Sequence, residues 1–389
     1  MALNRSSEQY DLAVVGAGIV GLAAALAGAR RGLRVIVIDR DAQANGASVR
    51  NFGFVTISGQ QRGSMWARAR RSRDVWREIA DAAGIAIVHT GLWMTARRPE
   101  AVGVLEAFMS TEMAEGCRLL TPAEARQRCP QLRAPQLAAV LESSSELRVE
   151  SRQAIARLAA WLAGTYAVSF LFGTTVRAID TPDVQTSSGR VHADRVVVCP
   201  GDDFNGLYAQ RLQTYRLTRC KLQMLRLSDP CFRLPGALMS DLGLGRYPGY
   251  AELAAATPLK ARLSLEQPLQ LAHGVHLIVV QSADGSLVVG DSHHYADTPD
   301  PFSHQAIDDL ILEEFRLALG IEPPPVVERW IGTYASAADR LVLFDAPAPS
   351  VRIVIVTCGA GASTGFAIGE EVMTSLLDAG APVDNGAHA

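Results

Sequence analysis

A glycine-rich turn near the amino end constrains the fold more than any other feature of this sequence. Residues 10–15 form a short apolar run that is compatible with a β-strand, and Gly16, Gly18 and Gly21 follow it directly. Residues 22–31 are rich in alanine and leucine and therefore favour a helix. Gly16 permits the tight turn, Gly18 lets a pyrophosphate approach the backbone, and Gly21 lets the helix pack closely on the strand. The sequence therefore predicts a Rossmann-type dinucleotide cradle, with the phosphates at the helix N-terminus.

An acidic residue follows at the distance that such a cradle requires. Residues 34–38 form a second buried-strand pattern that ends at Asp39, eighteen residues after Gly21. A carboxylate at this point can accept hydrogen bonds from both ribose hydroxyls of an adenosine. The motif itself does not separate FAD from NAD, although its place close to the amino end is typical of FAD enzymes.

The bulk composition narrows the class of protein. At 389 residues the chain is long enough for two domains, and its net charge of −3 without a basic stripe argues against a nucleic-acid partner. Six scattered cysteines without metal-ligand spacing predict reduced thiols and no metal site. Residues 1–9 are polar and do not resemble a secretory leader, and the apolar run 12–26 is interrupted by glycines. We therefore expect a cytoplasmic protein without a membrane partner.

A second glycine-rich junction lies near the carboxyl end. Residues 351–356 form a strand pattern, residues 357–367 contain three glycines, and a helix is expected to follow from about Ile368. After Asp39, residues 46–53 form a small-residue loop rather than another strand. The combination resembles the D-amino-acid oxidase and glycine/sarcosine oxidase superfamily of FAD enzymes. In that superfamily the first junction holds the pyrophosphate and the last lies against the flavin ring.

The middle of the chain carries the same resemblance. Residues 174–179 resemble the strand whose valine, here Val176, touches the adenine, and residues 193–201 resemble a later strand that ends in a glycine, here Gly201, near the cofactor. The resemblance implies an α/β fold with a Rossmann-type, GR2-like FAD-binding domain and a second, mixed-sheet α+β substrate domain. The FAD domain is expected to comprise residues 1–80, 147–215 and 325–389, and the substrate domain residues 81–146 and 216–324.

The resemblance also implies which residues contact the cofactor. They lie on the two junctions, the loop after the second strand and the middle strands: Gly16, Gly18, Ile19, Val20, Gly21, Asp39, Arg40, Ala47, Ser48, Asn51, Phe52, Gly53, Val176, Gly201, Gly332, Gly361, Ser363, Thr364 and Gly365. Sarcosine oxidases tether their flavin through a cysteine in the segment that corresponds to residues 329–334, and this sequence has no cysteine there. We therefore expect FAD to be bound non-covalently.

Three stretches resemble a narrower branch that is encoded beside phosphonate-degrading enzymes, namely residues 50–53, 220–224 and 284–295. This branch implies oxidation of 2-aminoethylphosphonate, or an N-methylated form, to phosphonoacetaldehyde. Hydride passes to the flavin, the imine hydrolyses, and O2 reoxidises the flavin to give hydrogen peroxide.

Three alternatives to this reaction remain open. The first is an oxidase of glycine, sarcosine or a D-amino acid. The second is a dehydrogenase that passes electrons to a quinone or a carrier protein, and the third is a protein that binds FAD without catalysis. An oligomer is compatible with the sequence, which does not determine the oligomeric state.

Amine oxidation by a flavin needs orienting residues rather than a catalytic triad. In a strand over residues 289–295, Asp291, His293 and Tyr295 share one face while His294 lies on the other. Because the adjacent histidines face opposite ways, this segment argues against a metal site. We expect either His293, in catalysis, or His294, in binding, to contact the substrate, and the alternative for each is a satisfied core or surface imidazole.

Cationic and phenolic side chains are candidates for holding the substrate. Arginine meets two oxygens of an anion at once, so Arg50, Arg219 and Arg246 are candidates, although each is also compatible with a solvated surface. Tyr247 adjoins Arg246, and Tyr334 is expected either to close the pocket or to pack in the core.

Lys221 is one of only two lysines in the chain. A lysine over the flavin stabilises developing superoxide and assists reduction of O2, so Lys221 is a candidate catalytic residue. The alternative is an exposed lysine on a strand.

Overall fold

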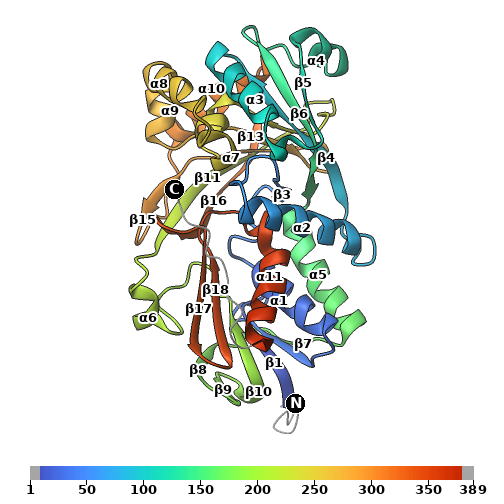
Figure 1. The fold of residues 1–389 in the computed structure, drawn as a ribbon, viewed down its shortest axis with the longest axis vertical. Helices are drawn as coiled ribbons and strands as arrows, with labels where there is room; N and C mark the ends of the chain where they lie inside the picture. The colour runs from blue at the N-terminus through green and yellow to red at the C-terminus, as the bar shows by residue number, and fades with distance from the viewer. Residues whose placement is uncertain (1–8, 379–389) are drawn as a thin grey trace.

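The chain is built around two β-sheets. The computed structural model describes residues 9–378, with an eight-stranded sheet in the lower half of Figure 1 and a ten-stranded sheet in the upper half. The predicted α/β fold, with a Rossmann-type sheet and a second mixed sheet, is confirmed.

The eight-stranded sheet has a parallel centre in which β1 pairs with both β2 and β10. Its strands are β1 (Gln9–Val15), β2 (Val35–Ile38), β7 (Ser169–Leu171), β8 (Val176–Asp180), β9 (Asp183–Thr186), β10 (Gly189–Val198), β17 (Val342–Ala348) and β18 (Val351–Val356). On β2, Val35 and Val37 pack into the core under the helices, whereas Ile36 and Ile38 pack into the core on the opposite face. A strand covered on both faces needs an apolar residue at every position, which explains why β2 shows no polar alternation.

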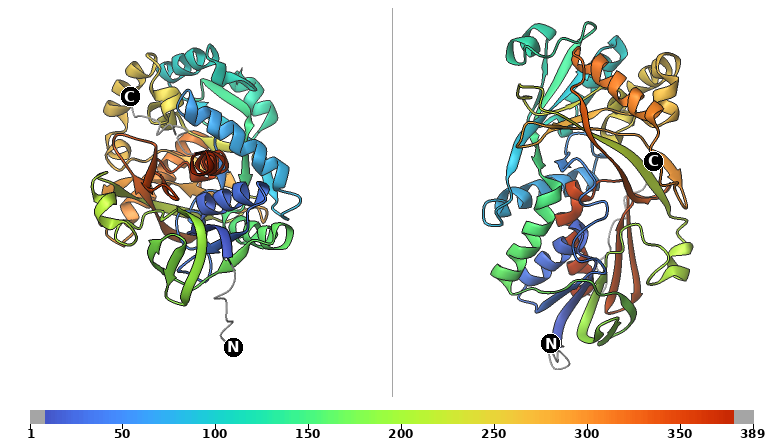
Figure 2. Two further views of the ribbon diagram at one scale, coloured as in Figure 1. Left: turned by 60° about the horizontal axis from the view of Figure 1, so that its bottom comes forward. Right: turned by 180° about the vertical axis from the view of Figure 1, so that it is seen from behind.

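Helices from both ends of the chain pack side by side on this sheet (Figure 1, Figure 2). They are α1 (Ile19–Arg30) and α11 (Gly361–Leu377), flanked by α2 (Ser64–Ile79) and α5 (Ser151–Tyr166). A Cβ on Gly369 would lie 2.5 Å from the carbonyl carbon of Ala23, so the two helices approach as closely as they do only because residue 369 is glycine. This contact brings the amino-terminal and carboxyl-terminal glycine turns together.

The ten-stranded sheet is mixed. The long strand β11 pairs antiparallel with β14, β15 and β16, while β12 runs parallel to β4. Its strands are β3 (Phe54–Val55), β4 (Ile87–Ala96), β5 (Cys117–Leu120), β6 (Ala139–Val149), β11 (Thr218–Leu227), β12 (Ala237–Met239), β13 (Ile278–Gln281), β14 (Leu287–Gly290), β15 (His294–Ala296) and β16 (Val326–Ser336).

Seven further helices within residues 9–378 complete the molecule. They are α3 (Pro99–Met109), α4 (Pro122–Arg128), α6 (Ala209–Gln213), α7 (Pro248–Ala251), α8 (Ala256–Glu266), α9 (Pro268–Ala272) and α10 (Gln305–Leu319), with 3-10 turns η1 (Glu112–Ala114) and η2 (Asp241–Gly245). Among all the helices between residues 9 and 378, none combines the length and the apolar character needed to cross a lipid bilayer.

Two strands join the halves of the molecule. β3 and β16 belong to the ten-stranded sheet, although the expected division of the chain assigns residues 1–80 and 325–389 to the FAD domain. The division into a discontinuous FAD domain and a substrate domain stays a prediction.

The helix contact at Gly369 leads to a stability prediction. Gly369→Ala is expected to lower the free energy of unfolding by about 1–3 kcal/mol, because the added methyl group forces α1 and α11 apart. Gly103→Ala is the matched control: a Cβ at Gly103, inside α3, has no atom within 4 Å, and alanine is the better helix former. Urea denaturation measures both variants, and equal unfolding free energies would contradict the close contact.

Candidate active site

A cavity of about 440 Å³ is lined by residues of both sheets. One part is formed by the carboxyl ends of β1, β2 and β10, which is where parallel sheets of this type bind dinucleotides. The other part is formed by the ten-stranded sheet, through residues such as Leu222, Ile278 and Tyr334.

The three glycines of the first turn have different roles in the structure. Gly16 has a φ of 105°, and a Cβ there would overlap the carbonyl oxygen of Cys199. A Cβ on Gly21 would overlap the carbonyl oxygen of Gly16, so these two glycines serve the packing of the chain itself. A Cβ on Gly18, in contrast, would meet only Oγ of Ser48, at 3.0 Å. Gly18 is therefore the position where a side chain would intrude mainly on the space for a ligand.

Two side chains hold backbone N–H groups around the start of α1. Oδ2 of Asp39 accepts a hydrogen bond from the N–H of Ala17 at 2.6 Å, and Oγ of Ser48 accepts one from the N–H of Ile19 at 3.0 Å. Both side chains line the cavity. Asp39 therefore lies at the end of β2, where a ribose of a bound dinucleotide would be held.

Most of the residues predicted to contact the cofactor line this one cavity. They are Gly16, Gly18, Ile19, Val20, Gly21, Asp39, Arg40, Ala47, Ser48, Asn51, Phe52, Val176, Gly201, Gly332, Gly361 and Ser363. Three of the predicted residues do not line the cavity, namely Gly53, Thr364 and Gly365. Gly53 has a φ of 65° and packs against Val149, and Gly365 packs against Ile19. The hydroxyl of Thr364 donates a hydrogen bond to the carbonyl of Ala360. Their positions make them supports for the fold at the site rather than cofactor contacts.

The residues present fit a flavin dinucleotide. Both glycine junctions, which are far apart in the sequence, face the same cavity, and its lining is mainly apolar. Gly18 and the start of α1 would hold the pyrophosphate, Asp39 the ribose, and the junction at Gly361 and Ser363 the flavin.

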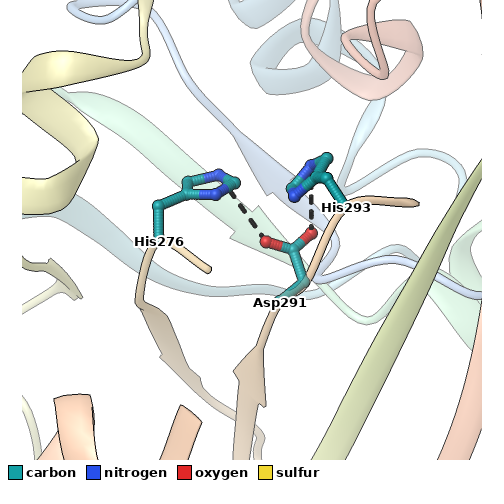
Figure 3. Close-up of side chains that lie close together, drawn as sticks. All are labelled: His276, Asp291 and His293. Atoms are coloured by element: carbon teal, nitrogen blue, oxygen red, sulfur yellow. Dashed lines mark ion pairs between the residues drawn. The ribbon is translucent and has the colours of Figure 1, made fainter. Parts of the chain in front are cut away.

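Polar side chains gather where the ten-stranded sheet meets the cavity. Tyr247, His276, Asp291, His293 and Tyr334 all line it. Nε2 of His276 lies 3.6 Å and Nε2 of His293 lies 3.8 Å from the carboxyl oxygens of Asp291 (Figure 3). Burial raises the pKa of Asp291 to about 8 and lowers the pKa of both histidines well below its usual value. Burial therefore favours the neutral form of all three groups.

Arg246 is not itself a lining residue of the cavity, but its positive charge acts on the lining residues His276 and Asp291. Its guanidinium donates a hydrogen bond to the hydroxyl of Tyr295 at 2.9 Å. Burial lowers the pKa of Arg246, but Tyr295, Tyr334 and Asp291 act in the opposite direction and raise it overall, so the group keeps its charge. The same charge adds to the effect of burial in lowering the pKa of His276.

Lys221 does not reach the cavity. Its neighbour Leu222 lines the cavity, whereas Nζ of Lys221 donates hydrogen bonds to Asp300 at 2.7 Å and to the carbonyl of Phe302 at 3.0 Å. Lys221 is only 2% exposed, so the alternative of an exposed strand lysine is wrong as well. Because the ammonium is held on the other face of β11, we do not retain a role for Lys221 over the flavin.

The other two candidate arginines differ in position. Arg219 donates to the carbonyl of Asp202 at 2.9 Å and packs over the ring of Phe204, and it does not line the cavity. Arg50 does line the cavity, where its guanidinium donates to Oδ1 of Asn45 at 3.1 Å. The structure therefore keeps Arg50 and Arg246 near the site and places Arg219 elsewhere.

The predicted continuous strand over residues 289–295 is wrong, because β14 ends at Gly290 and β15 begins at His294, but the adjacent histidines do point in different directions. His293 lines the cavity, whereas Nε2 of His294 lies 3.0 Å from Nδ1 of His273 and does not contribute to the wall. His276 was not singled out from the sequence. The one feature of the sequence that marks His276 is its place directly before the apolar residues 277–280. This feature does not reveal that His276 pairs with Asp291.

Comparison with known proteins supports this assignment of the fold and the cavity. The family model of the FAD dependent oxidoreductases, DAO, matches residues 11–374. The chain is 24% identical over 353 residues to the bifunctional protein ThiO/ThiG of Nostoc sp., a match that covers 85% of this chain and 47% of that protein. It thus spans about half the length of this curated relative.

Solved structures share the fold at low sequence identity. Glycine oxidase from Geobacillus kaustophilus is 18% identical, with a TM-score of 0.74 and 97% of each chain covered. L-proline dehydrogenase from P. horikoshii is also 18% identical, with a TM-score of 0.75 and coverage of 95% of this chain and 94% of that one.

Substitutions at Gly18 and Gly21 are expected to affect different properties, flavin binding at Gly18 and the stability of the fold at Gly21. Gly18→Ala is expected to weaken flavin binding at least about tenfold, because the methyl group takes space beside the start of α1, while the unfolding of the flavin-free protein changes little. Gly21→Ala is expected to destabilise the flavin-free protein itself, because its Cβ overlaps backbone. Flavin titration and thermal unfolding of both variants check this, and the opposite pattern would contradict it.

The cavity thiols support non-covalent binding. Cys199 and Cys358 line the cavity, and burial raises their pKa to about 12 and about 11, so neither is a reactive thiolate at neutral pH. Acid precipitation is expected to leave a colourless pellet and a yellow supernatant. A yellow pellet that turns colourless in Cys358→Ser would instead identify a flavin–cysteine bond.

Proposed function

The chain belongs to the DAO family of FAD-dependent oxidoreductases, and on this premise we propose that it oxidises a small amine that carries an anionic group. Membership of this family confirms the cofactor and the enzyme class expected from the sequence. The observation that carries the proposal is the charge of Arg246. Its guanidinium is partly buried beside the cavity, and among residues 9–378 no carboxylate lies within ion-pair distance of it.

The more deeply buried arginines of this protein differ from Arg246 in this respect. Arg68, Arg97, Arg98 and Arg148 each pair with a carboxylate at 2.7 to 3.2 Å. A desolvated cation that lacks such a partner is costly unless a ligand supplies the opposite charge. The phosphonate or carboxylate of a bound substrate would supply it.

The chain contributes binding and orientation to the reaction. FAD, when bound, accepts the hydride from the carbon next to the substrate nitrogen. Arg246 holds the anionic group, and its positive charge disfavours a second cation, so the bound amine loses its proton more readily. Phe52, Leu222 and Ile278 exclude water from the same cavity.

Hydroxyl and imidazole groups complete this part of the site. Tyr247 and Tyr334 line the cavity with their hydroxyls protonated, since burial raises the pKa of each. With His293 they offer hydrogen bonds that would orient the amine and its anionic group.

The substrate that we propose is 2-aminoethylphosphonate or an N-methylated form, converted to phosphonoacetaldehyde with hydrogen peroxide formed from O2. All three stretches that resemble the phosphonate-associated branch contribute cavity residues: Phe52 from the first, Leu222 from the second, and Asp291 and His293 from the third.

Two other functions have specific support. The shared fold with glycine oxidase favours glycine, sarcosine or a D-amino acid as the alternative substrate. The equally similar fold of L-proline dehydrogenase favours transfer of electrons to an acceptor other than O2.

Peroxide release and anaerobic bleaching of the flavin distinguish these functions. 2-Aminoethylphosphonate or its N-methyl form is expected to bleach the flavin without O2 and to give peroxide with O2, whereas glycine, sarcosine and D-alanine react more slowly. Faster reaction with an amino acid would favour the glycine-oxidase alternative. Bleaching without peroxide would favour the dehydrogenase.

Removal of the Arg246 charge tests whether this residue binds the anionic group of the substrate. Arg246→Gln is expected to raise KM for the anionic amine by roughly tenfold to a hundredfold, since a hydrogen bond to a charged group contributes about 1.5–3 kcal/mol. Arg316→Gln is the matched control, because Arg316 lies on α10 and pairs with Glu322 at the surface. An equal effect of the two substitutions on KM would contradict the assignment.

A further inference from the structure

Two histidines and one aspartate converge at the cavity wall. Each of His276, Asp291 and His293 offers one ligand atom, and these atoms all lie within 4.8 Å of one another (Figure 3). The three residues are 3%, 4% and 8% exposed. They come from segments that lie side by side. His276 lies just before β13 and Asp291 just after β14, and the backbone N–H of each donates a hydrogen bond to the carbonyl of the other.

The backbone fixes the orientation of both imidazoles. The carbonyl oxygen of Gly274 lies 3.0 Å from Nδ1 of His293 and 3.3 Å from Nδ1 of His276. A carbonyl only accepts hydrogen bonds, so each Nδ1 carries the proton and each Nε2 presents a lone pair toward Asp291. Metal-binding histidines usually have their second nitrogen held in this way.

One oxygen of the Asp291 carboxyl group has no hydrogen-bond partner among residues 9–378. This oxygen, Oδ1, is buried, and the nearest imidazole nitrogens present lone pairs rather than protons. When Asp291 is ionised, its carboxylate and the Nε2 lone pair of His293 face one another in a buried place with no cation between them. Such an arrangement is costly unless a positively charged group occupies it.

We propose that His276, Asp291 and His293 bind one divalent transition-metal ion. Two imidazole nitrogens and one carboxylate oxygen are the ligand set that Zn²⁺ accepts, and three protein ligands leave a fourth position open. All three residues line the cavity, so the open position faces it. Alternation along residues 289–295 argues against a metal site because it separates His293 from His294, whereas the second imidazole here comes from His276.

One contact must give way when the ion binds. The hydroxyl of Tyr247 lies 3.1 Å from Nε2 of His276 and donates a hydrogen bond to the same lone pair that the metal would use. Removal of this hydroxyl is therefore expected to preserve or strengthen metal binding.

The open position deepens the proposed function, on which this step rests. An ion there and the guanidinium of Arg246 would together attract one anionic group, and a phosphonate or carboxylate oxygen would take the fourth position. The amine would then be held from its charged end, with its reacting carbon free to approach the flavin.

Metal binding is measured on the FAD-loaded protein after treatment with EDTA. Titration with Zn²⁺ by calorimetry, and metal analysis after gel filtration, are expected to give one ion per chain. Asp291→Asn and His293→Ala are each expected to weaken Zn²⁺ binding roughly 100-fold or more, because each removes one of three ligands. Tyr247→Phe is expected to bind at least as tightly as the parent protein.

His294→Ala is the matched control, because His294 adjoins His293 but pairs with His273 outside the cavity. It is expected to keep the full Zn²⁺ affinity, and the flavin content of each variant reports whether it has folded. The proposal is overturned if the parent protein binds no zinc, or if Asp291→Asn and His293→Ala bind it as tightly as His294→Ala does.

Binding of inorganic phosphate tests whether the metal ion attracts the anionic group of the substrate, independently of whether the metal site exists. Phosphate is expected to bind at least about tenfold more tightly to the zinc-loaded protein than to the EDTA-treated protein. Equal phosphate affinities with zinc bound would overturn the anchoring role and leave the metal site in place. Zinc binding in a protein that oxidises no amine would refute the proposed function alone.

Discussion

The close packing of α1 against α11 is the contact on which the rest of the structure depends. These helices begin at the two glycine turns, one at each end of the chain, and Gly369 lets their backbones approach to the distance at which both turns face one cavity. Helix packing of this kind is decided by side-chain size at the contact, and here the smallest side chains occupy it. The cofactor cavity is therefore a consequence of helix packing as much as of the glycine motif.

The buried cations of this protein are paired with carboxylates within the described residues 9–378. Arg97 and Arg98 are neutralised by Asp241 and Glu314, as burial of a cation requires. Beside the cavity, and within residues 9–378, Arg246 has no carboxylate at ion-pair distance and Oδ1 of Asp291 has no hydrogen-bond partner. Uncompensated polar groups are typical of functional sites, because a ligand completes them.

Alternation along strands decided which candidates reach the cavity. On β11, Leu222 faces it and Lys221 faces Asp300, and in the segment after β14, His293 faces it and His294 does not. The period of two was evident in the sequence, and the adjacent histidines do separate, although residues 291–293 lie between β14 and β15 rather than in a strand. It could not show which face of β11 was turned toward the flavin, because that depends on how the ten-stranded sheet is placed against the other.

The sequence by itself determined the dinucleotide turn, the acidic residue after β2 and the second glycine junction, because each is a local pattern in which a few neighbouring residues specify the backbone. Only the tertiary structure decided the composition of the substrate side. His276 meets Asp291 through the pairing of segments at the ends of β13 and β14, and the carbonyl of Gly274 orients two imidazoles that are seventeen residues apart (293 − 276). Contacts of this kind depend on strand register and sheet placement, which are set by the whole core and leave no short motif in the chain.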